Sequence, residues 1–174
     1  MRRSDATLNL NPRVAVPPDL AMEDLTKLIA GHAFLKGLEP EHVELLKADA
    51  RLTRFAAGVG IAREGDEANR FYLLLTGEVA LEALIPGRGQ VGFQTVGTGD
   101  ALGWSWLLPP YRWHFTARAA TDVEALEWDT ATLRVVAEKH PRFGYELSRR
   151  LTQLLLARLQ ATHSQLVEFY GPGN

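Results

Sequence analysis

The residues best able to do chemistry in this 174-residue chain gather in one stretch, "GDALGWSWLLPPYRWHF", residues 99–115. It holds three tryptophans, an arginine, a histidine and a Pro-Pro pair between two segments that read as strands. A turn does not need this aromatic mass, and a core strand would not hold two prolines. The indole faces could stack on a flat ligand, and Arg112 could pair with an anion. This stretch is therefore the candidate ligand site.

Other kinds of chemistry find less support in the residues. The absence of cysteine excludes thiolate catalysis, disulfides and Cys-ligated metals. Four of the five histidines fall in or beside expected helices, and only His114 lies in the expected β region, so no metal site is predicted. The sequence has no Gly-x-Ser-x-Gly elbow and no Walker phosphate loop, and the carboxylates of "EGDEANR" are expected in a solvated turn. We predict a non-enzyme.

The net charge and the hydropathy of the sequence indicate which classes of binding partner to expect. A net charge of −2 provides no basic surface for nucleic acid or an anionic membrane. "MRRSDATLNLNPRVAVPPDL" has no apolar region behind its arginines, and no stretch approaches the roughly 18–20 apolar residues of a membrane span. We expect a cytoplasmic protein that binds neither nucleic acid nor membrane.

The first 50 residues predict an arm and two helices. Residues 1–18, with three prolines and little periodicity, are expected to be a flexible or docking arm. "DLAMEDLTKLIAG" predicts a helix from Asp19 as N-cap to Gly31. "LEPEHVELLKADA" predicts a second helix with Pro40 in its first turn.

From residue 51 the apolar period becomes two, and glycines divide the chain into short segments. In "VALEALI" one face is expected to carry Val79, Leu81, Ala83 and Ile85, and the other Glu82. "PGRG" predicts a hairpin turn, and later core positions are Val123, Leu126 and Trp128. Short strands at regular spacing predict a small barrel or jelly roll.

The period then returns to 3.6 residues. "DTATLRVVAEKH" predicts a helix with Asp129 as N-cap that stops before Pro141, and residues 142–170 predict one of about 43 Å that ends at Gly171. Its apolar row is Leu147, Leu151, Leu155, Leu159, Thr162, Leu166 and Phe169. So long a helix would extend past a small barrel, so we expect a homodimer through this row; the alternative is a helix that only covers its own barrel.

This order of elements, and the spacing within "RFAAGVGIAREGDEANRFYLLLTGEVAL", resemble the cyclic-nucleotide-binding domain family, which includes the ligand domains of the catabolite activators and of the protein kinase A regulatory subunit. The matching positions are Phe55, Gly58, Ile61, Gly65, Asp66, Phe71, Tyr72, Gly77 and Val79. The resemblance continues through "GTGDALG" and covers roughly residues 30 to 170. It implies an α+β fold, an antiparallel, jelly-roll-like β-roll flanked by N-terminal helices and a long C-terminal helix.

The resemblance also implies that the stretch after Asp100 is the phosphate-binding cassette, a short helix whose amides hold the cyclic phosphate. In the family a Glu directly after the cassette glycine accepts from the ribose 2′-hydroxyl, and an Arg ten residues after the glycine pairs with the phosphate. Here the glycine is Gly103, and Trp104 and Trp113 stand at those two positions. The family's later Thr and Ala match Thr116 and Ala119 without a gap.

Both signature side chains are therefore replaced. Each lost charge-assisted hydrogen bond costs about 1.5–3 kcal/mol, so two remove on the order of a hundredfold to ten-thousandfold in affinity. We do not expect ordinary cAMP binding. Arg112 is adjacent but should face the other way along an extended segment, unless a bulge at Pro109-Pro110 turns it inward.

Two interpretations of the pocket stay open. The first is a pocket adapted to a cyclic nucleotide or another small anionic or aromatic ligand, with stacking on the aromatic side chains and hydrogen bonds from the cassette amides and the Ser105 hydroxyl. Its candidate residues are Gly103, Trp104, Ser105, Trp106, Leu107, Arg112, Trp113, His114 and Thr116. The second is a pocket filled by its own tryptophans in a ligand-free module that binds a protein partner.

The predicted organisation is an arm (1–18), a cyclic-nucleotide-binding-like domain (19–140) and a C-terminal dimerisation and output helix (141–174). No helix-turn-helix follows the long helix within the sequence, so we expect this chain not to bind DNA itself. The predicted function is a stand-alone regulatory sensor that signals through its C-terminal helix. A truncated transcription regulator of the same family is the other alternative.

Overall fold

The structure is a computed structural model that describes residues 22–170. The chain divides at Arg134/Val135 into two compact units. The first unit begins with helices α1 (Met22–Gly31) and α2 (Pro40–Lys47) and a 3₁₀ turn, η1 (Ala33–Leu35), between them. The expected N-cap Asp19 and the arm 1–18 lie outside the described residues.

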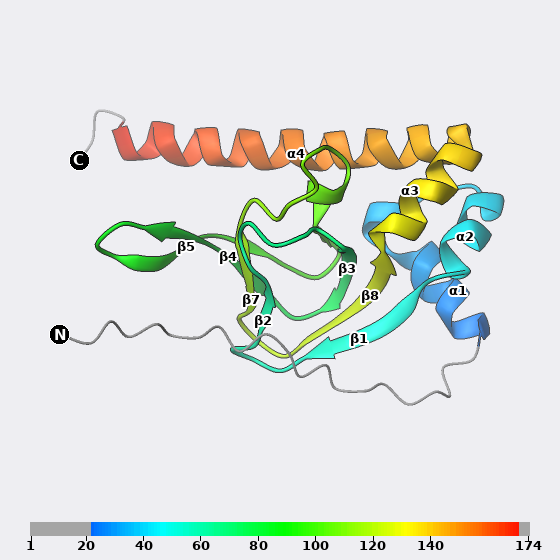
Figure 1. Cartoon of the computed structure of the whole chain (residues 1–174), viewed down its shortest axis with the longest axis horizontal. Helices are drawn as coiled ribbons and strands as arrows, with labels where there is room; N and C mark the ends of the chain where they lie inside the picture. The colour runs from blue at the N-terminus through cyan, green and yellow to red at the C-terminus, as the bar shows by residue number, and fades with distance from the viewer. Residues whose placement is uncertain (1–21, 171–174) are drawn as a thin grey trace. The chain divides into compact units, whose positions relative to one another are not determined.

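Eight strands in two antiparallel four-stranded sheets make up most of the first unit (Figure 1). The first sheet has the order β1 (Arg51–Phe55), β8 (Val123–Asp129), β3 (Arg70–Thr76), β6 (Ala101–Leu102). The second has the order β2 (Gly60–Ala62), β7 (Thr116–Ala119), β4 (Val79–Ile85), β5 (Gly89–Val96). The predicted α+β fold with an antiparallel β-roll is confirmed.

The core of this unit is built around aromatic side chains. Phe71 on β3 has its ring centroid 6.0 Å from those of Phe34, Trp106 and Trp128. The indole N–H of Trp128 donates to the Leu46 carbonyl at 2.8 Å, which ties α2 to β8. The predicted core positions Val123, Leu126 and Trp128 are all buried.

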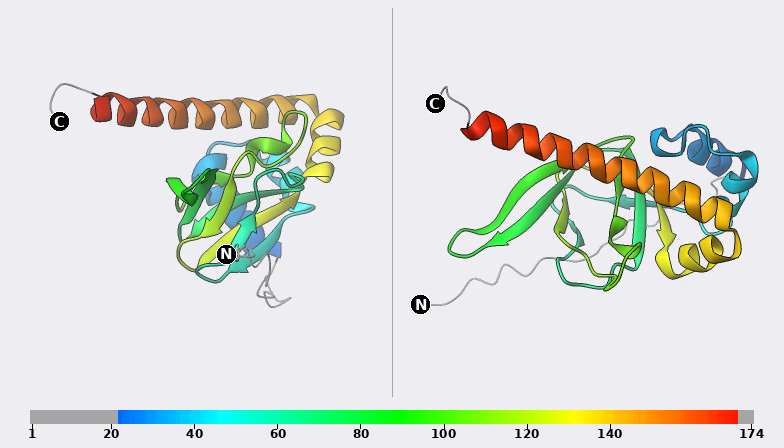
Figure 2. Two further views of the ribbon diagram at one scale, coloured as in Figure 1. Left: turned by 60° about the vertical axis from the view of Figure 1, so that its left-hand side comes forward. Right: turned by 90° about the horizontal axis from the view of Figure 1, so that it is seen from above.

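The β4–β5 hairpin turns at "PGRG", as predicted, and extends away from the other strands of its sheet (Figures 1 and 2). Along β4, Val79 and Leu81 are buried and Ala83 is half-buried, whereas Ile85 is 39% exposed. Ile85 lies near the hairpin tip, beyond Glu82, which is the last β4 residue paired with β7, so less of the sheet covers it. Glu82 is half-buried and forms an ion pair with Arg118 on β7, with 3.0 Å between Nε and Oε1.

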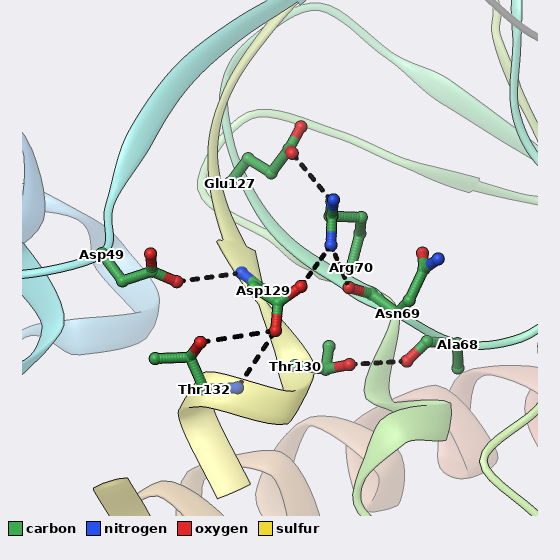
Figure 3. Close-up of polar contacts among 8 residues, drawn as sticks. All are labelled: Asp49, Ala68, Asn69, Arg70, Glu127, Asp129, Thr130 and Thr132. Carbon is green, nitrogen blue, oxygen red and sulfur yellow. Dashed lines mark hydrogen bonds and ion pairs between the residues drawn. The ribbon is translucent and has the colours of Figure 1, made fainter. Parts of the chain in front are cut away.

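Helix α3 (Thr130–Lys139) begins where the sequence predicts, because Asp129 caps it. Asp129 Oδ1 accepts from the Thr132 amide at 3.0 Å, and Oδ2 accepts from Arg70 (Figure 3). The hydrogen bond from Thr132 is the largest cause that holds the pKa of Asp129 below its usual value, and the Arg70 charge adds to it. Arg70 also pairs with buried Glu127 at 3.0 Å, so one guanidinium connects two residues of β8 (Figure 3).

The second unit contains the 30-residue helix α4 (Pro141–Tyr170), which begins and ends within one residue of the prediction. Its apolar row divides by burial. Leu147 and Leu151 are buried and Leu155 is half-buried, whereas Leu159 and Leu166 are 67% and 52% exposed. The side chain of Phe169 lies outside the described residues. None of the helices in the described range is both long and apolar enough to cross a membrane.

Candidate functional site

The candidate site starts at Gly103, directly after β6. Gly103 has φ +95°, and a Cβ added there would lie 2.8 Å from the Arg70 carbonyl oxygen and 2.8 Å from the Trp113 ring. The turn before it is held to β3, because the Gly99 amide donates to the Leu74 carbonyl and the Leu74 amide to the Asp100 carbonyl. A glycine is therefore required at this point by its conformation and by the close approach of two neighbours.

The expected short helix is present as a single 3₁₀ turn, η2 (Trp104–Trp106). The Leu107 amide donates to the Trp104 carbonyl at 3.0 Å and closes the turn. The amides of the first turn have no partner within the helix, as at any helix start. One turn is too short to add an appreciable helix dipole.

Three of the candidate residues form a compact polar and aromatic group. The buried Ser105 hydroxyl lies 2.9 Å from Nδ1 of the exposed His114 ring, and the tautomer of the imidazole decides which of the two donates. The Trp104 indole stacks on the same imidazole, with 4.7 Å between centroids and 21° between planes. We call Trp104, Ser105 and His114 the cassette cluster.

An aromatic row continues from the cassette cluster onto the second sheet. Phe115 lies 6.5 Å from His114 between centroids, and Phe93 on β5 lies 4.8 Å from Phe115. Phe93 was not among the predicted site residues. The apolar alternation of Val91 and Phe93 was its only signal, and it did not indicate which strand would lie next to the cassette.

The other two tryptophans are core residues. Trp113 is 7% exposed and its ring contacts the position of the missing Gly103 side chain. Trp106 is 1% exposed and packs edge-on against Phe71. Its indole N–H has no hydrogen-bond partner among the described residues. The large aromatic mass of the stretch therefore divides into one accessible indole, that of half-buried Trp104, and two buried ones.

Arg112 points away from Gly103. The backbone around it forms a short antiparallel bridge with Glu67, and the Trp113 amide donates to the Asp66 carbonyl at 2.9 Å. Side chains alternate along such a segment, so Trp113 is buried and Arg112 is exposed. Nη1 of Arg112 donates to the Gly65 carbonyl at 2.8 Å.

The last two candidates, Thr116 and Leu107, are neighbours of the cassette cluster in the sequence and are not members of it. Thr116 is buried, and its hydroxyl accepts from the Glu64 amide at 3.2 Å, which stabilises the turn at residues 63–66. Leu107 is half-buried at the end of η2. The structure thus brings together Gly103, Trp104, Ser105 and His114, with Trp113 packed beneath Gly103.

A cavity of about 330 Å³ is lined in part by Trp113. Its lining includes an aromatic and a charged set, namely Phe55, Tyr72, Trp113, Arg63, Asp66 and Glu67. Several of these positions belong to the early-strand pattern noted in the sequence, but their convergence on a cavity was not predicted. Within residues 22–170, no cluster of three or more metal-ligating side chains occurs.

Comparisons with known proteins identify the family and the fold. Residues 52–140 match the family described as "Cyclic nucleotide-binding domain". A CRP-like cAMP-activated global transcriptional regulator of Mycobacterium tuberculosis is 24% identical over 144 residues, which cover 83% of this chain. The chain corresponds to only 62% of that relative's length.

Solved structures show the same fold. A cyclic nucleotide-binding domain from Methylobacillus flagellatus superposes with a TM-score of 0.71 at 20% identity, covering 87% of this chain and 85% of its own. The catabolite activator protein of Thermus thermophilus gives a TM-score of 0.62 at 24% identity, covering 79% of this chain and 62% of its own. At these identities the likeness extends to the fold and not to the ligand.

Proposed function

The chain belongs to the cyclic nucleotide-binding domain family, and we propose that it is a stand-alone regulatory sensor of that family with a divergent phosphate cassette. The family is one of regulatory binding domains, so the proposed activity is recognition and not catalysis. The observation that carries the proposal is the buried Trp113 ring against Gly103, at the position where the family resemblance places the phosphate-binding arginine.

The proposed recognition surface is the cassette cluster together with the accessible part of Trp104. The exposed His114 ring, held through Nδ1 by the buried Ser105 hydroxyl, supplies a polar nitrogen beside a flat indole. Such a set suits a small ligand that combines an anionic or polar group with a planar, apolar one. It lacks the carboxylate and guanidinium that the family uses for ribose and phosphate.

The proposed output is helix α4. Its exposed leucines, Leu159 and Leu166, with half-buried Leu155 on the same row, form the proposed homodimer contact. A signal would pass to a protein partner through this helix. The cytoplasmic location and the absence of DNA binding by this chain stay predictions.

The second candidate function is a ligand-free interaction module. It is favoured by the burial of Trp106 and Trp113, which shows that much of the aromatic mass fills the core. A domain of this kind would bind its partner constitutively. The alternative of a truncated transcription regulator requires further chain and is compatible with the length of the curated relative.

The deciding experiment is a thermal-shift panel with cAMP, cGMP, cyclic dinucleotides, ATP and simple organic acids at millimolar concentration. A ligand at a hundred times its Kd stabilises the folded state by about 2.7 kcal/mol, or several degrees in Tm. We expect a shift with a ligand other than cAMP or cGMP that His114→Ala abolishes. His163→Ala, which changes an exposed histidine on α4, is the matched control and should keep the shift.

Two other outcomes would reject the proposal. A shift with cAMP that persists in His114→Ala and is lost in Arg112→Ala would mean that Arg112 serves as the phosphate ligand after all. No shift with any compound, in a protein that melts cooperatively, would favour the ligand-free module.

A further inference from the structure

A second pocket, of about 250 Å³, lies outside the cassette cluster, at the junction of the Pro-Pro loop and helix α3. It is lined by Glu67, Ala68, Pro110, Tyr111, Arg112 and Arg134. None of these side chains belongs to the cassette cluster. The pocket brings together two arginines that lie 22 positions apart in the sequence (134 − 112).

Each guanidinium is held in place by one backbone carbonyl. Arg112 Nη1 donates to Gly65 O at 2.8 Å, and Arg134 Nη1 donates to Trp106 O at 3.4 Å. Neither arginine forms an ion pair with a carboxylate anywhere in residues 22–170. Since a guanidinium has five N–H donors, each arginine keeps donors for a ligand after its orientation is set.

Tyr111 links the two arginines. Its backbone has φ +56°, uncommon for a residue with a side chain, and its carbonyl accepts from the Ala68 amide at 2.8 Å. The Arg134 guanidinium lies over the Tyr111 ring, 4.7 Å from the centroid. Stacking leaves the edge of the guanidinium available for hydrogen bonds in its own plane. Left-handed residues of this kind occur where a binding geometry is maintained against local strain.

We propose that Arg112 and Arg134 form a subsite for a small organic anion, a phosphate monoester or a carboxylate, that carries a hydroxyl group. Two arginines favour an anionic oxygen group through charge-assisted hydrogen bonds. Glu67, on the same wall, repels excess negative charge and can accept from a ligand hydroxyl. The volume is below the usual range for pockets that hold drug-sized ligands, which favours a small anion.

This subsite is separate from the proposed sensor function. The cassette cluster consists of Trp104, Ser105 and His114. The subsite is formed by other side chains, Arg112 from the same loop and Arg134 from α3. The alternation that buries Trp113 is also what places Arg112 in the outer pocket. Either site could be occupied without the other.

The test is an NMR titration of the ¹⁵N-labelled full chain with inorganic phosphate, glycerol 3-phosphate and malate. We expect saturable shifts at Ala68, Tyr111 and the Arg112 and Arg134 side chains. Arg112→Gln and Arg134→Gln should each weaken binding at least tenfold, and Arg88→Gln, an exposed arginine in the β4–β5 turn, should not change it. Glu67→Gln should reduce the preference for glycerol 3-phosphate over inorganic phosphate. Saturation by glycerol 3-phosphate alone or by malate alone would identify the anion as phosphate or carboxylate, and both support the subsite.

The proposal is overturned if the shifts do not saturate, or if they are unchanged in Arg134→Gln. It is also overturned if they occur only at Gly103–Trp106 and disappear in His114→Ala, because the anion would then occupy the cassette. Circular dichroism melting checks that each variant is folded. If Arg112→Gln unfolds, Arg112→Lys keeps the charge without the planar fork and should show an intermediate affinity.

Discussion

At the residue scale, the candidate site is shaped by the opposite directions that two neighbouring side chains take. Trp113 is buried against Gly103, and Arg112 is directed outward to Gly65. An extended backbone allows one of two successive side chains to face the core, and the larger apolar one does so here. The buried Trp113 ring therefore lies next to Gly103, at the position where the family resemblance places a guanidinium.

The close approach at Gly103 gives a stability prediction. Gly103→Ala should destabilise the fold by well over the roughly 1–2 kcal/mol of left-handed strain, because its Cβ would overlap the Arg70 carbonyl and the Trp113 ring. Gly87→Ala is the matched control, with φ +81° and nothing within 4 Å of the added Cβ. Chemical denaturation of both variants measures the difference. If both variants lose the same free energy of unfolding, the residues around Gly103 move to accommodate the added Cβ at no cost.

His32 gives a pH prediction. Burial is the largest effect on its pKa and lowers it below 6.5, although the Leu74 carbonyl and the Asp100 charge act in the opposite direction. Its Nδ1 accepts from the Phe34 amide at 3.2 Å, and its Nε2 lies 3.0 Å from the Leu74 carbonyl, so the neutral form fits both partners. Protonation would replace the Nδ1 acceptor with a donor.

Because the unfolded chain binds the proton more readily, the free energy of unfolding should fall as pH decreases from about 7 through the lowered pKa. Denaturation midpoints between pH 7 and pH 5 would measure this, and His32→Gln should flatten the dependence. The pKa of Asp129 is also lowered, from an ordinary value of 3.8. Its contribution to the free energy of unfolding is therefore lost only as the pH falls below about that value, outside this window. If the free energy of unfolding depends on pH equally in the parent chain and in His32→Gln, His32 is not the group responsible.

At the element scale, strands β3 and β8 determine where the cassette begins. Arg70 pairs through its side chain with Glu127 and Asp129 on β8, and its carbonyl limits the space at Gly103 (Figure 3). Thr130 adds a hydrogen bond from its hydroxyl to the Ala68 carbonyl at 2.8 Å. The start of α3 and the start of the cassette are thus tied to the same end of β3.

Arg70→Gln should therefore destabilise the protein by about 3 kcal/mol, the lower end for a broken buried pair, because Glu127 is buried while Arg70 is partly exposed. Arg54→Gln, which breaks the more exposed pair with Glu124, should cost less than about 1 kcal/mol. Urea unfolding measures both. The double change Arg70→Gln with Glu127→Gln should recover part of the loss, and a failure to do so would mean that the pair is not the cause.

At the scale of the whole molecule, the long helix α4 carries apolar side chains that remain exposed. Its apolar row is buried through Leu151 and exposed at Leu159 and Leu166. Exposed leucines at helical spacing favour association with a second helix. Homodimerisation through this row stays a proposal, and the oligomeric state decides it.

Sedimentation equilibrium should show a dimer in the full chain, and Leu159→Glu with Leu166→Glu should shift it to monomer. Ala161→Glu with Ser164→Glu adds the same charge to positions on the opposite side of the helix and should leave the dimer intact. A monomeric parent chain, or two double variants with equal effects, would reject the leucine row as the interface.

The elements themselves could be predicted from local signals. Pro40, Asp129 and Pro141 marked helix starts, and "PGRG" marked the hairpin, because capping and turn preferences act over a few residues. The exposure of Ile85 could not be predicted from the alternation, because it depends on how far the β4–β5 hairpin extends beyond the residues that pair with β7.

The sequence by itself determined the order of the elements and the resemblance to the family, and the replacement of two signature side chains stays a prediction. The tertiary structure alone decided that Trp113 fills the space over Gly103, that His114 joins Ser105 and Trp104, and that Arg112 meets Arg134. The physical reason is that periodicity and capping are local, whereas these contacts depend on how separate segments pair. The bridge between Glu67 and Arg112 is such a pairing, and it sets which face of the loop is buried.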